Sequence, residues 1–325
     1  MSSEIATRLL PADTSTIENA AKILRSGGLV AFPTETVYGL GANAADGKAV
    51  ARLYAAKGRP SFNPLISHVA DLEAARKLAR FDALSEKLAR AFWPGPLTLV
   101  LHKADGCNVS DLATAGLESI AIRVPNHPVA RDLLRAFGGA IVAPSANRSG
   151  HVSPTTAQHV MEDLKGRIDL VLDGGQTQVG VESTIVSCLE GAPMLLRPGG
   201  IARADIERII GGPLEDPPLP VDLAALLAPG MLASHYAPNA AIRLDATRVE
   251  PGEALLAFGP ALLPGATITL NLSARGDLTE AAANLFSHLR ALDGTASKIA
   301  VMPVPMAGLG EAINDRLARA AAPKN

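Results

Sequence analysis

The feature that most constrains the fold is the stretch from Gly28 to Asn43, GLVAFPTETVYGLGAN, in which an apolar run stops abruptly. The successive apolar residues from Leu29 to Phe32 suit a strand that is covered on both faces rather than one half exposed to water. Pro33 ends this strand because it has no backbone N–H to donate. The hydroxyls, the carboxylate and the glycines that follow then lie past the carboxyl end of a strand, where open α/β sheets bind ligands.

The segment from Gly39 to Ala44, GLGANA, matches the permissive dinucleotide-binding pattern G-x-G-x-x-A, but its context argues against that function. The pattern must follow the strand directly, whereas several residues intervene here. About 20 residues further on, where a ribose-binding acid is expected, the chain has Lys57 and Arg59. We therefore interpret the segment as a glycine-rich connection, and the neighbouring hydroxyls and Glu35 favour a ligand-binding role over a bare turn.

Length, cysteine content and charge narrow the class of protein. With 325 residues, the chain exceeds the size at which a single core usually stops growing, so we expect two domains. The sequence has no bilayer-length apolar run and no signal-peptide pattern, which predicts a cytoplasmic protein without a membrane segment. Cys107 and Cys188 lack CxxC spacing, which argues against structural zinc or a disulfide. The formal net charge of −2 disfavours a protein that mainly holds nucleic acid, because such binding needs a cationic excess.

Helical and strand patterns alternate up to about residue 205 and predict an α/β domain over residues 1–205. We expect a twisted mixed sheet with flanking helices around a ligand cavity. The first predicted element is a helix that begins at the capping-box spacing of Ser15 and Glu18 and ends at Gly27. Further helices are predicted near 46–56, 71–79, 84–92, 128–136 and 155–164, with strands near 65–69, 97–102, 120–124, 140–143, 170–172, 183–187 and 194–196.

The composition changes after this domain, where five prolines lie between Pro213 and Pro229. Prolines suit an extended linker, which we place at residues 206–238. A plain spacer does not need the pair His235-Tyr236, so we expect the end of the linker to reach the active site. Residues 239–325 are predicted to form a small Rossmann-like α/β domain with strands near 242–244, 254–258, 267–272 and 299–302 and helices at 278–292 and 311–322.

Two short pairs of polar residues follow predicted elements and are candidates for phosphate contacts. Lys57 and Arg59 could clamp a polyphosphate, since an ammonium is a point charge and a guanidinium can fork onto two oxygens. They could equally be solvated charges at a helix end. Ser145 and Asn147 follow a buried strand and suit either an ordinary turn or contacts to a sugar, base or phosphate. The sequence has no Walker A pattern, so ATP would have to bind without one.

Other candidate residues pose similar choices. Arg123 ends an otherwise apolar strand and needs a partner, either the carboxylate of a ligand or an internal acid, if its guanidinium is not in water. Ser183 and Arg197 allow the same alternatives. His68, within a strand, is interpreted as a core or ligand-orienting residue rather than a general base. The sequence has no HExxH or GxSxG pattern, which disfavours a metalloprotease or a serine hydrolase.

Together these stretches resemble the L-threonylcarbamoyladenylate synthase family in its longer, two-domain form. The resemblance covers nearly the whole chain and rests on the order of several motifs: PTETVYGLG, the pair Lys57-x-Arg59, the pair Ser145-x-Asn147, GVEST, LRPG, PGMLASHYAP and GLGEAINDRL. Any one of these could arise by chance. Their number and order make the match specific.

The resemblance implies a nucleotidyltransferase that makes L-threonylcarbamoyl-AMP and pyrophosphate from L-threonine, bicarbonate and ATP. That reaction would be the first step of tRNA threonylcarbamoyladenosine (t6A) modification next to the anticodon. Mg²⁺ is expected to enter with ATP, and no residue of the chain is assigned to a metal. The expected partner is a tRNA threonylcarbamoyl transferase complex that takes over the product, with at most a weak or transient contact to tRNA. Two alternatives stay open: a module that binds double-stranded RNA or tRNA, and a related carbamoyl-handling enzyme with another acceptor.

The resemblance also implies site residues. L-threonine would be held by Thr36, His68, Arg123, the backbone of Ala143, and Ser183. ATP would be held by Arg59, Asn63, Ser119, Ser145, Asn147, Ser153, Arg197 and Tyr236, and Lys57 and Arg59 are the expected catalytic pair. Because the reaction joins anions, cations and fixed donors would lower the barrier without a covalent nucleophile. We expect these residues to converge in one electropositive hollow.

Overall fold

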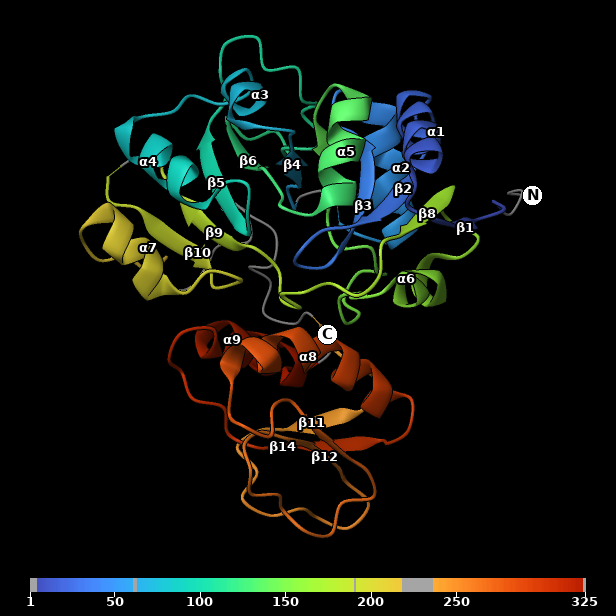
Figure 1. The fold of residues 1–325 in the computed structure, drawn as a ribbon, viewed down its shortest axis with the longest axis vertical. Helices are drawn as coiled ribbons and strands as arrows, with labels where there is room; N and C mark the ends of the chain where they lie inside the picture. The colour runs from blue at the N-terminus through green and yellow to red at the C-terminus, as the bar shows by residue number, and fades with distance from the viewer. Residues whose placement is uncertain (1–4, 61–62, 190, 218–235, 324–325) are drawn as a thin grey trace.

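The computed structural model of the chain describes residues 5–60, 63–189, 191–217 and 236–323 (Figure 1). Helices and strands alternate along the chain, which confirms the predicted α/β class. In chain order the elements are β1 (Arg8–Pro11), α1 (Thr14–Arg25), β2 (Val30–Pro33), β3 (Tyr38–Asn43), α2 (Gly47–Lys57), β4 (Ile66–His68), α3 (Leu72–Arg76), α4 (Ala83–Phe92), β5 (Leu97–His102), β6 (Ser119–Arg123), α5 (Pro128–Phe137), β7 (Ile141–Val142), α6 (Ala157–Leu164), β8 (Leu170–Asp173), β9 (Thr184–Ser187), β10 (Met194–Arg197), α7 (Arg203–Ile210), β11 (Ala241–Arg243), β12 (Ala254–Ala257), β13 (Thr269–Asn271), α8 (Leu278–Asp293), β14 (Lys298–Val301) and α9 (Gly310–Ala321).

A mixed sheet forms the centre of the larger, N-terminal domain. Within the described residues it has 10 strands in the order β1-β8-β2-β3-β7-β4-β6-β5-β9-β10. Strand β2 is buried along its whole length, as the apolar run predicts. Its side chains alternate between two cores: Val30 and Phe32 pack with α1 and α5, whereas Ala31 packs with α2 and α6 on the other face. The strand is therefore covered on both faces.

The prediction of a glycine-rich connection after β2 was wrong, because the segment from Tyr38 to Asn43 is strand β3. It pairs antiparallel with β2, and Phe32 lies opposite Gly39. A Cβ added to Gly41 would lie 2.9 Å from the ring of Phe32 and 3.1 Å from the carbonyl oxygen of Val30. The glycine leaves room for this aromatic ring across the sheet. It does not form a phosphate-binding turn.

The start of the chain also differs from the prediction. Strand β1 precedes the first helix and pairs in parallel with β8 at the edge of the sheet. The helix α1 is capped by Asp13, whose carboxylate accepts a 2.8 Å hydrogen bond from the backbone N–H of Thr16. The capping-box spacing of Ser15 and Glu18 is not the cap. A short and mostly exposed edge strand has no apolar run, so its pattern did not reveal it.

Helix α7 was not predicted, and it contains the predicted domain boundary at residue 205. Its buried residue Ile206 belongs to the main core of the N-terminal domain, and α7 packs against α4. Of the predicted linker, residues 218–235 lie outside the described residues. This range includes His235, the first residue of the pair His235-Tyr236 that we expected to reach the active site.

The C-terminal domain, residues 239–323, contains a second sheet. In the described residues it has 4 parallel strands in the order β11-β14-β12-β13. Helices α8 and α9 lie between this sheet and the N-terminal domain (Figure 1). One apolar cluster joins residues of α8 and α9 to Val37, Val152 and Val181 of the N-terminal domain. The core of the C-terminal domain thus extends to these three residues of the N-terminal domain. Within the described ranges, no helix combines the length and apolar character that crossing a lipid bilayer requires.

Candidate active site

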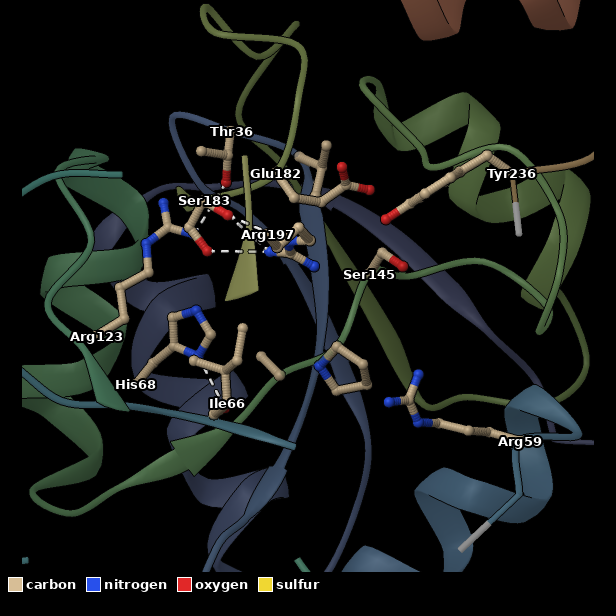
Figure 2. Close-up of a pocket in the computed structure, with 13 residues that line it drawn as sticks. Thr36, Arg59, Ile66, His68, Arg123, Ser145, Glu182, Ser183, Arg197 and Tyr236 are labelled. Atoms are coloured by element: carbon tan, nitrogen blue, oxygen red, sulfur yellow. Dashed lines mark hydrogen bonds between the residues drawn. The ribbon is translucent and has the colours of Figure 1, made fainter. Parts of the chain in front are cut away.

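A pocket opens on the face of the large sheet that α1 and α5 partly cover (Figure 2). It lies where several elements end, and its residues come from segments far apart in the sequence. His68 and Ile141 are paired across β4 and β7, so their side chains are on that same face. The lining residues are Thr36, Val37, Arg59, Ile66, His68, Arg123, Ala143, Pro144, Ser145, Glu182, Ser183, Arg197 and Tyr236.

Arg123, at the end of β6, is buried with 3 % of its surface exposed. Its Nη2 lies 2.7 Å from Oε1 of Glu35, and its Nη1 donates a 3.0 Å hydrogen bond to Oγ1 of Thr36. The backbone carbonyl of Gly95 accepts a further bond from its Nε at 3.3 Å. The alternative of an internal acid is therefore realised, and Glu35 fixes the guanidinium at the rim of the pocket. Sequence reasoning had singled out Glu35 only as a polar neighbour of the glycines.

The ring of His68 lies beside Arg123 in the same pocket (Figure 2). Its Nδ1 lies 3.2 Å from the carbonyl oxygen of Ile66, so we assign the proton to Nδ1, which leaves Nε2 as an acceptor. Burial, and to a smaller extent the charge of Arg123, lowers the pKa of His68 to about 3. The imidazole is therefore neutral at neutral pH. A base this weak suits ligand orientation better than proton abstraction.

The other end of the pocket holds Arg59 with the hydroxyl groups of Ser145 and Tyr236, and Arg197 lies between the two ends, beside Ser183 (Figure 2). Burial lowers the pKa of Arg59 to about 10, so its guanidinium stays charged at neutral pH. Arg197 is buried and donates from Nε and Nη2 to the carbonyl oxygen of Ser183, at 3.2 and 2.9 Å. With Arg123, the lining has three guanidinium groups, which makes the pocket suited to anions.

Tyr236 enters the pocket from the described end of the linker. Its backbone is left-handed, with φ 62°, a conformation that side-chain-bearing residues rarely adopt. Its ring is 1 % exposed and stacks on Phe286 of α8 at a centroid distance of 5.5 Å. Tertiary packing thus holds the phenol in place, since a strained backbone persists only where its surroundings fix it.

Glu182 is a lining carboxylate that sequence reasoning mentioned only as part of a motif. Its Oε1 accepts a 2.5 Å hydrogen bond from Ser153, and its Oε2 accepts a 2.9 Å bond from Arg316 of α9. Burial disfavours the charged carboxylate, but the charges of Arg316 and Arg197 outweigh it and lower the pKa of Glu182 to about 2. The position in a polar loop before a strand was the available signal. No feature of the sequence indicated the pairing with Arg316.

Lys57 and Asn147 lie beneath the pocket, outside its lining. Lys57 ends α2 as a buried residue, and its Nζ donates to the backbone carbonyls of Ser145 and Asn147. Burial, and next the charge of Arg59, lowers its pKa well below the ordinary value. The amide of Asn147 donates to the carbonyls of Arg148 and His151, at 2.9 and 2.7 Å. The two side chains thus shape the loop that carries Ser145.

Three further predicted ATP contacts also lie outside the lining. Ser153 is behind Glu182, to which it donates. Asn63 is buried, and its backbone carbonyl accepts a 3.0 Å hydrogen bond from the hydroxyl of Tyr54. Ser119 is a buried residue at the start of β6, at the opposite end of that strand from Arg123. The structure thus brings together nine of the predicted residues and leaves these three, with Lys57 and Asn147, outside the lining.

Within the part of the chain that the structure describes, no group of three or more His, Cys, Asp or Glu residues could hold a metal ion. Glu35 and Glu182, the acids of the site, are each held by an arginine. Cys107 and Cys188 are both free thiols.

Comparison with known proteins places the chain in a family. A family model described as "Telomere recombination" matches residues 22–199. A second, described as "Threonylcarbamoyl-AMP synthase, C-terminal domain", matches residues 201–322. The threonylcarbamoyl-AMP synthase of Pyrococcus abyssi is 43% identical, and the match covers 94% of this chain and 93% of that protein. The chain belongs to the threonylcarbamoyl-AMP synthase family.

Two other comparisons agree with this family. The threonylcarbamoyl-AMP synthase of Bacillus subtilis is also 43% identical, over 94% of this chain and 92% of that protein. A crystal structure of P. abyssi Sua5 complexed with L-threonine has a TM-score of 0.87 at 40% identity, covering 98% of this chain and 97% of that one. Both domains of the threonylcarbamoyl-AMP synthase fold are therefore present here, and the chain is an enzyme of the nucleotidyltransferase type.

Proposed function

We propose that this enzyme makes L-threonylcarbamoyl-AMP and pyrophosphate from L-threonine, bicarbonate and ATP. One observation carries the proposal: a single pocket has Arg123, His68 and Thr36 at one end and Arg59 and Tyr236 at the other, with Arg197 between them (Figure 2). An amino acid can then lie beside a nucleotide. The L-threonine complex of the similar P. abyssi protein supports the choice of amino acid.

The amino-acid end is suited to L-threonine. We assign the carboxylate to Arg123, whose orientation Glu35 fixes, because a guanidinium recognises a carboxylate through paired hydrogen bonds. Thr36, the neutral ring of His68, the backbone of Ala143 and the hydroxyl of Ser183 complete this end. Their hydrogen-bonding groups would position the amine and hydroxyl of the ligand.

The nucleotide end is suited to a triphosphate. Arg59 and Arg197 supply charge, and Ser145 and Tyr236 supply hydroxyl groups. Asn63, Ser119 and Ser153 are proposed as further ATP contacts on the resemblance of their motifs. Lys57 and Asn147 would act here by holding the loop that carries Ser145. Mg²⁺ would arrive with ATP as part of that substrate.

The reaction follows from this arrangement. Bicarbonate loses hydroxide to give carbon dioxide, the amine of threonine adds to it, and the proton that the amine loses combines with the hydroxide as water. The resulting carbamate oxygen attacks the α-phosphorus of ATP. The bond to the β-phosphate oxygen breaks, and pyrophosphate leaves. Guanidinium groups held in a buried pocket stabilise the charge that develops on the leaving group, and positioning lowers the remaining barrier. No covalent intermediate with the protein is required.

The product is a mixed anhydride, and water hydrolyses such compounds. We therefore propose that it passes to a tRNA threonylcarbamoyl transferase complex and that this reaction is the first step of t6A formation next to the anticodon. Direct contact with tRNA would be weak and transient.

The test is mass detection of threonylcarbamoyl-AMP, with pyrophosphate release, after mixing the chain with L-threonine, bicarbonate and Mg-ATP. Formation of the product only in the complete mixture is the expected result. Pyrophosphate release that follows another amino acid in place of threonine would indicate a carbamoyl-handling enzyme with another acceptor. Retention on RNA at moderate salt without nucleotide turnover would indicate a binding module instead.

A further inference from the structure

Arg316, on α9 of the C-terminal domain, is a guanidinium with no exposed surface (0 %). Its Nε donates a 2.9 Å hydrogen bond to Oε2 of Glu182, and its Nη1 donates a 2.6 Å bond to Asp315. A buried charge is costly unless it is paired and hydrogen-bonded. One of its two partners lines the pocket of the other domain, so this charge is placed where it acts on the site.

The same guanidinium contacts a second lining residue. Its Cζ lies 5.3 Å from the centroid of the Tyr236 ring, within the range of a cation–π contact. That ring also stacks on Phe286, and the backbone of Tyr236 is strained. The C-terminal domain thus supports Tyr236 with an aromatic ring from α8 and a cation from α9.

Glu182 has the wrong charge for a site that binds a triphosphate. An unpaired carboxylate in the lining would repel the phosphates and attract Arg197 away from them. Arg316 opposes this charge, and Ser153 occupies the other carboxylate oxygen. Burial opposes the charge of Arg316, but Tyr236, Glu182 and Asp315 raise its pKa above the ordinary value. The compensating charge is therefore permanent.

Other ion pairs also join the domains but involve no lining residue. Arg203 of α7 pairs with Glu311 of α9 at 2.9 Å, and Arg290 of α8 pairs with Asp163 of α6 at 2.7 Å. These two pairs can therefore join the domains without the pair of Arg316 and Glu182. The pair of Arg316 and Glu182 differs because its carboxylate is part of the site.

We propose that Arg316 is a positioning residue through which the C-terminal domain neutralises Glu182 and holds Tyr236, so that the pocket accepts ATP. This inference rests on the proposed function. It assigns the C-terminal domain a direct part in nucleotide binding. We expect its effect to be larger at the nucleotide end of the pocket, because the contacts of Arg123 and His68 do not involve α9.

The test compares Arg316→Met with the double variant Glu182→Gln, Arg316→Met. Arg316→Met should raise KM for ATP at least tenfold and leave the Kd of L-threonine, measured by calorimetry, within twofold of wild type. The double variant should recover most of the loss, since no unpaired carboxylate is left. Arg316→Lys should lie between wild type and Arg316→Met. Glu311→Gln is the matched control, because it breaks a cross-domain pair on the same helix and should leave KM for ATP unchanged.

Two results would overturn the proposal: an unchanged KM for ATP in folded Arg316→Met, or a double variant no better than the single one. Thermal unfolding of each variant identifies a loss of folding. If Arg316→Met does not fold, KM for ATP is compared between wild type, the double variant and Arg316→Lys instead. A non-hydrolysable ATP analogue separates the two proposals. Its weaker binding to Arg316→Met would support the role of Arg316 even if the wild-type enzyme made no threonylcarbamoyl-AMP.

Discussion

Arg59 is the guanidinium of the pocket that contributes least to holding the protein together. It is half-buried, and its Nη2 donates to the carbonyl oxygens of Asn63 and Pro64, at 3.4 and 3.2 Å. Arg123 and Arg197, by contrast, are buried and donate hydrogen bonds to Thr36 and Ser183, in the loops before β3 and β9. The function of Arg59 and its contribution to stability can therefore be separated.

We expect Arg59→Ala to abolish measurable pyrophosphate release while changing the free energy of unfolding by less than about 1 kcal/mol, because it leaves no buried charge unpaired. Coupled pyrophosphate detection and urea unfolding measure the two quantities. Full activity in this variant would remove Arg59 from the catalytic machinery.

From the lowered pKa of His68 we predict that the free energy of unfolding depends on pH. Its pKa is about 3 in the folded state, against about 6.5 in an unfolded chain. The unfolded state therefore binds the additional proton as the pH falls below about 6.5, so the contribution to stability is complete above that pH and is lost toward pH 3. His159, whose pKa burial lowers to about 4, acts in the same direction.

We expect the wild-type urea midpoint to fall between pH 7 and pH 5 and the midpoint of His68→Asn to fall less. His159→Asn is the control: it should also flatten the pH profile but leave L-threonine affinity unchanged, because His159 lies outside the lining of the pocket. Parallel profiles for wild type and His68→Asn would contradict the assignment of a neutral, buried imidazole.

At the residue scale, local pattern was informative where a charged or hydroxyl residue directly follows an apolar strand. Arg123 and Ser145 are in such places, and both line the pocket. Lys57, at the end of helix α2, was predicted to contact phosphate, but its side chain turns inward to two carbonyls. The pair of Glu182 and Arg316 joins residues 134 positions apart, and no local pattern contains that information.

Among the elements, α2 has a second task besides covering the sheet. Its last residue, Lys57, lies in the position where a helix C-terminus favours a cation. The ammonium reaches past the helix end to the loop after β7 and fixes two of its carbonyl groups. Lys57 therefore ties the end of the helix to the Ser145 loop.

We expect Lys57→Met to lower the free energy of unfolding by about 1–3 kcal/mol, because it leaves two buried carbonyl groups without their donor. It should also raise KM for ATP, since the loop carries Ser145. Urea unfolding and steady-state kinetics measure both effects. Loss of activity without loss of stability would instead place the ammonium on the substrate, as the sequence motif implied.

Elements were predicted correctly where burial imposes a pattern. Strands β2, β5 and β6 are apolar runs in the sheet interior, and the sequence predicted each of them. Strand β1 is short and mostly exposed, so it lacks such a run. Strand β3 contains glycines because the Phe32 ring packs over it, and glycine by itself resembles a turn signal.

On the scale of the whole molecule, a close backbone contact adds to the apolar cluster and the ion pairs that join the two domains. Gly180 has φ 77°, and a Cβ there would lie 2.3 Å from the carbonyl oxygen of Ala282 and 2.4 Å from Cα of Ala283 on α8. The loop before β9 can approach α8 this closely only without a side chain. The chain composition predicted two domains, but it contained no signal for how they meet.

We expect Gly180→Ala to lower the free energy of unfolding by well over the roughly 1–2 kcal/mol that a left-handed backbone alone costs. It should also raise KM for ATP, because α8 carries Phe286 beneath Tyr236. Gly175→Ala is the matched control, since it has φ 82° with no neighbour within 4 Å and should show the backbone cost alone. Equal destabilisation in both variants would mean that the domain contact tolerates a methyl group.

The late position of Tyr236 has a consequence for synthesis. Domains emerging from a ribosome fold in order, the N-terminal one first. A nascent chain can therefore complete the large sheet with Thr36, Arg59 and Arg123 in place, yet lack the phenol that lines the nucleotide end. If Tyr236 and α9 serve the nucleotide end as we propose, turnover begins only after translation has passed both. Incomplete polypeptides would then neither spend ATP nor release a reactive acyl phosphate.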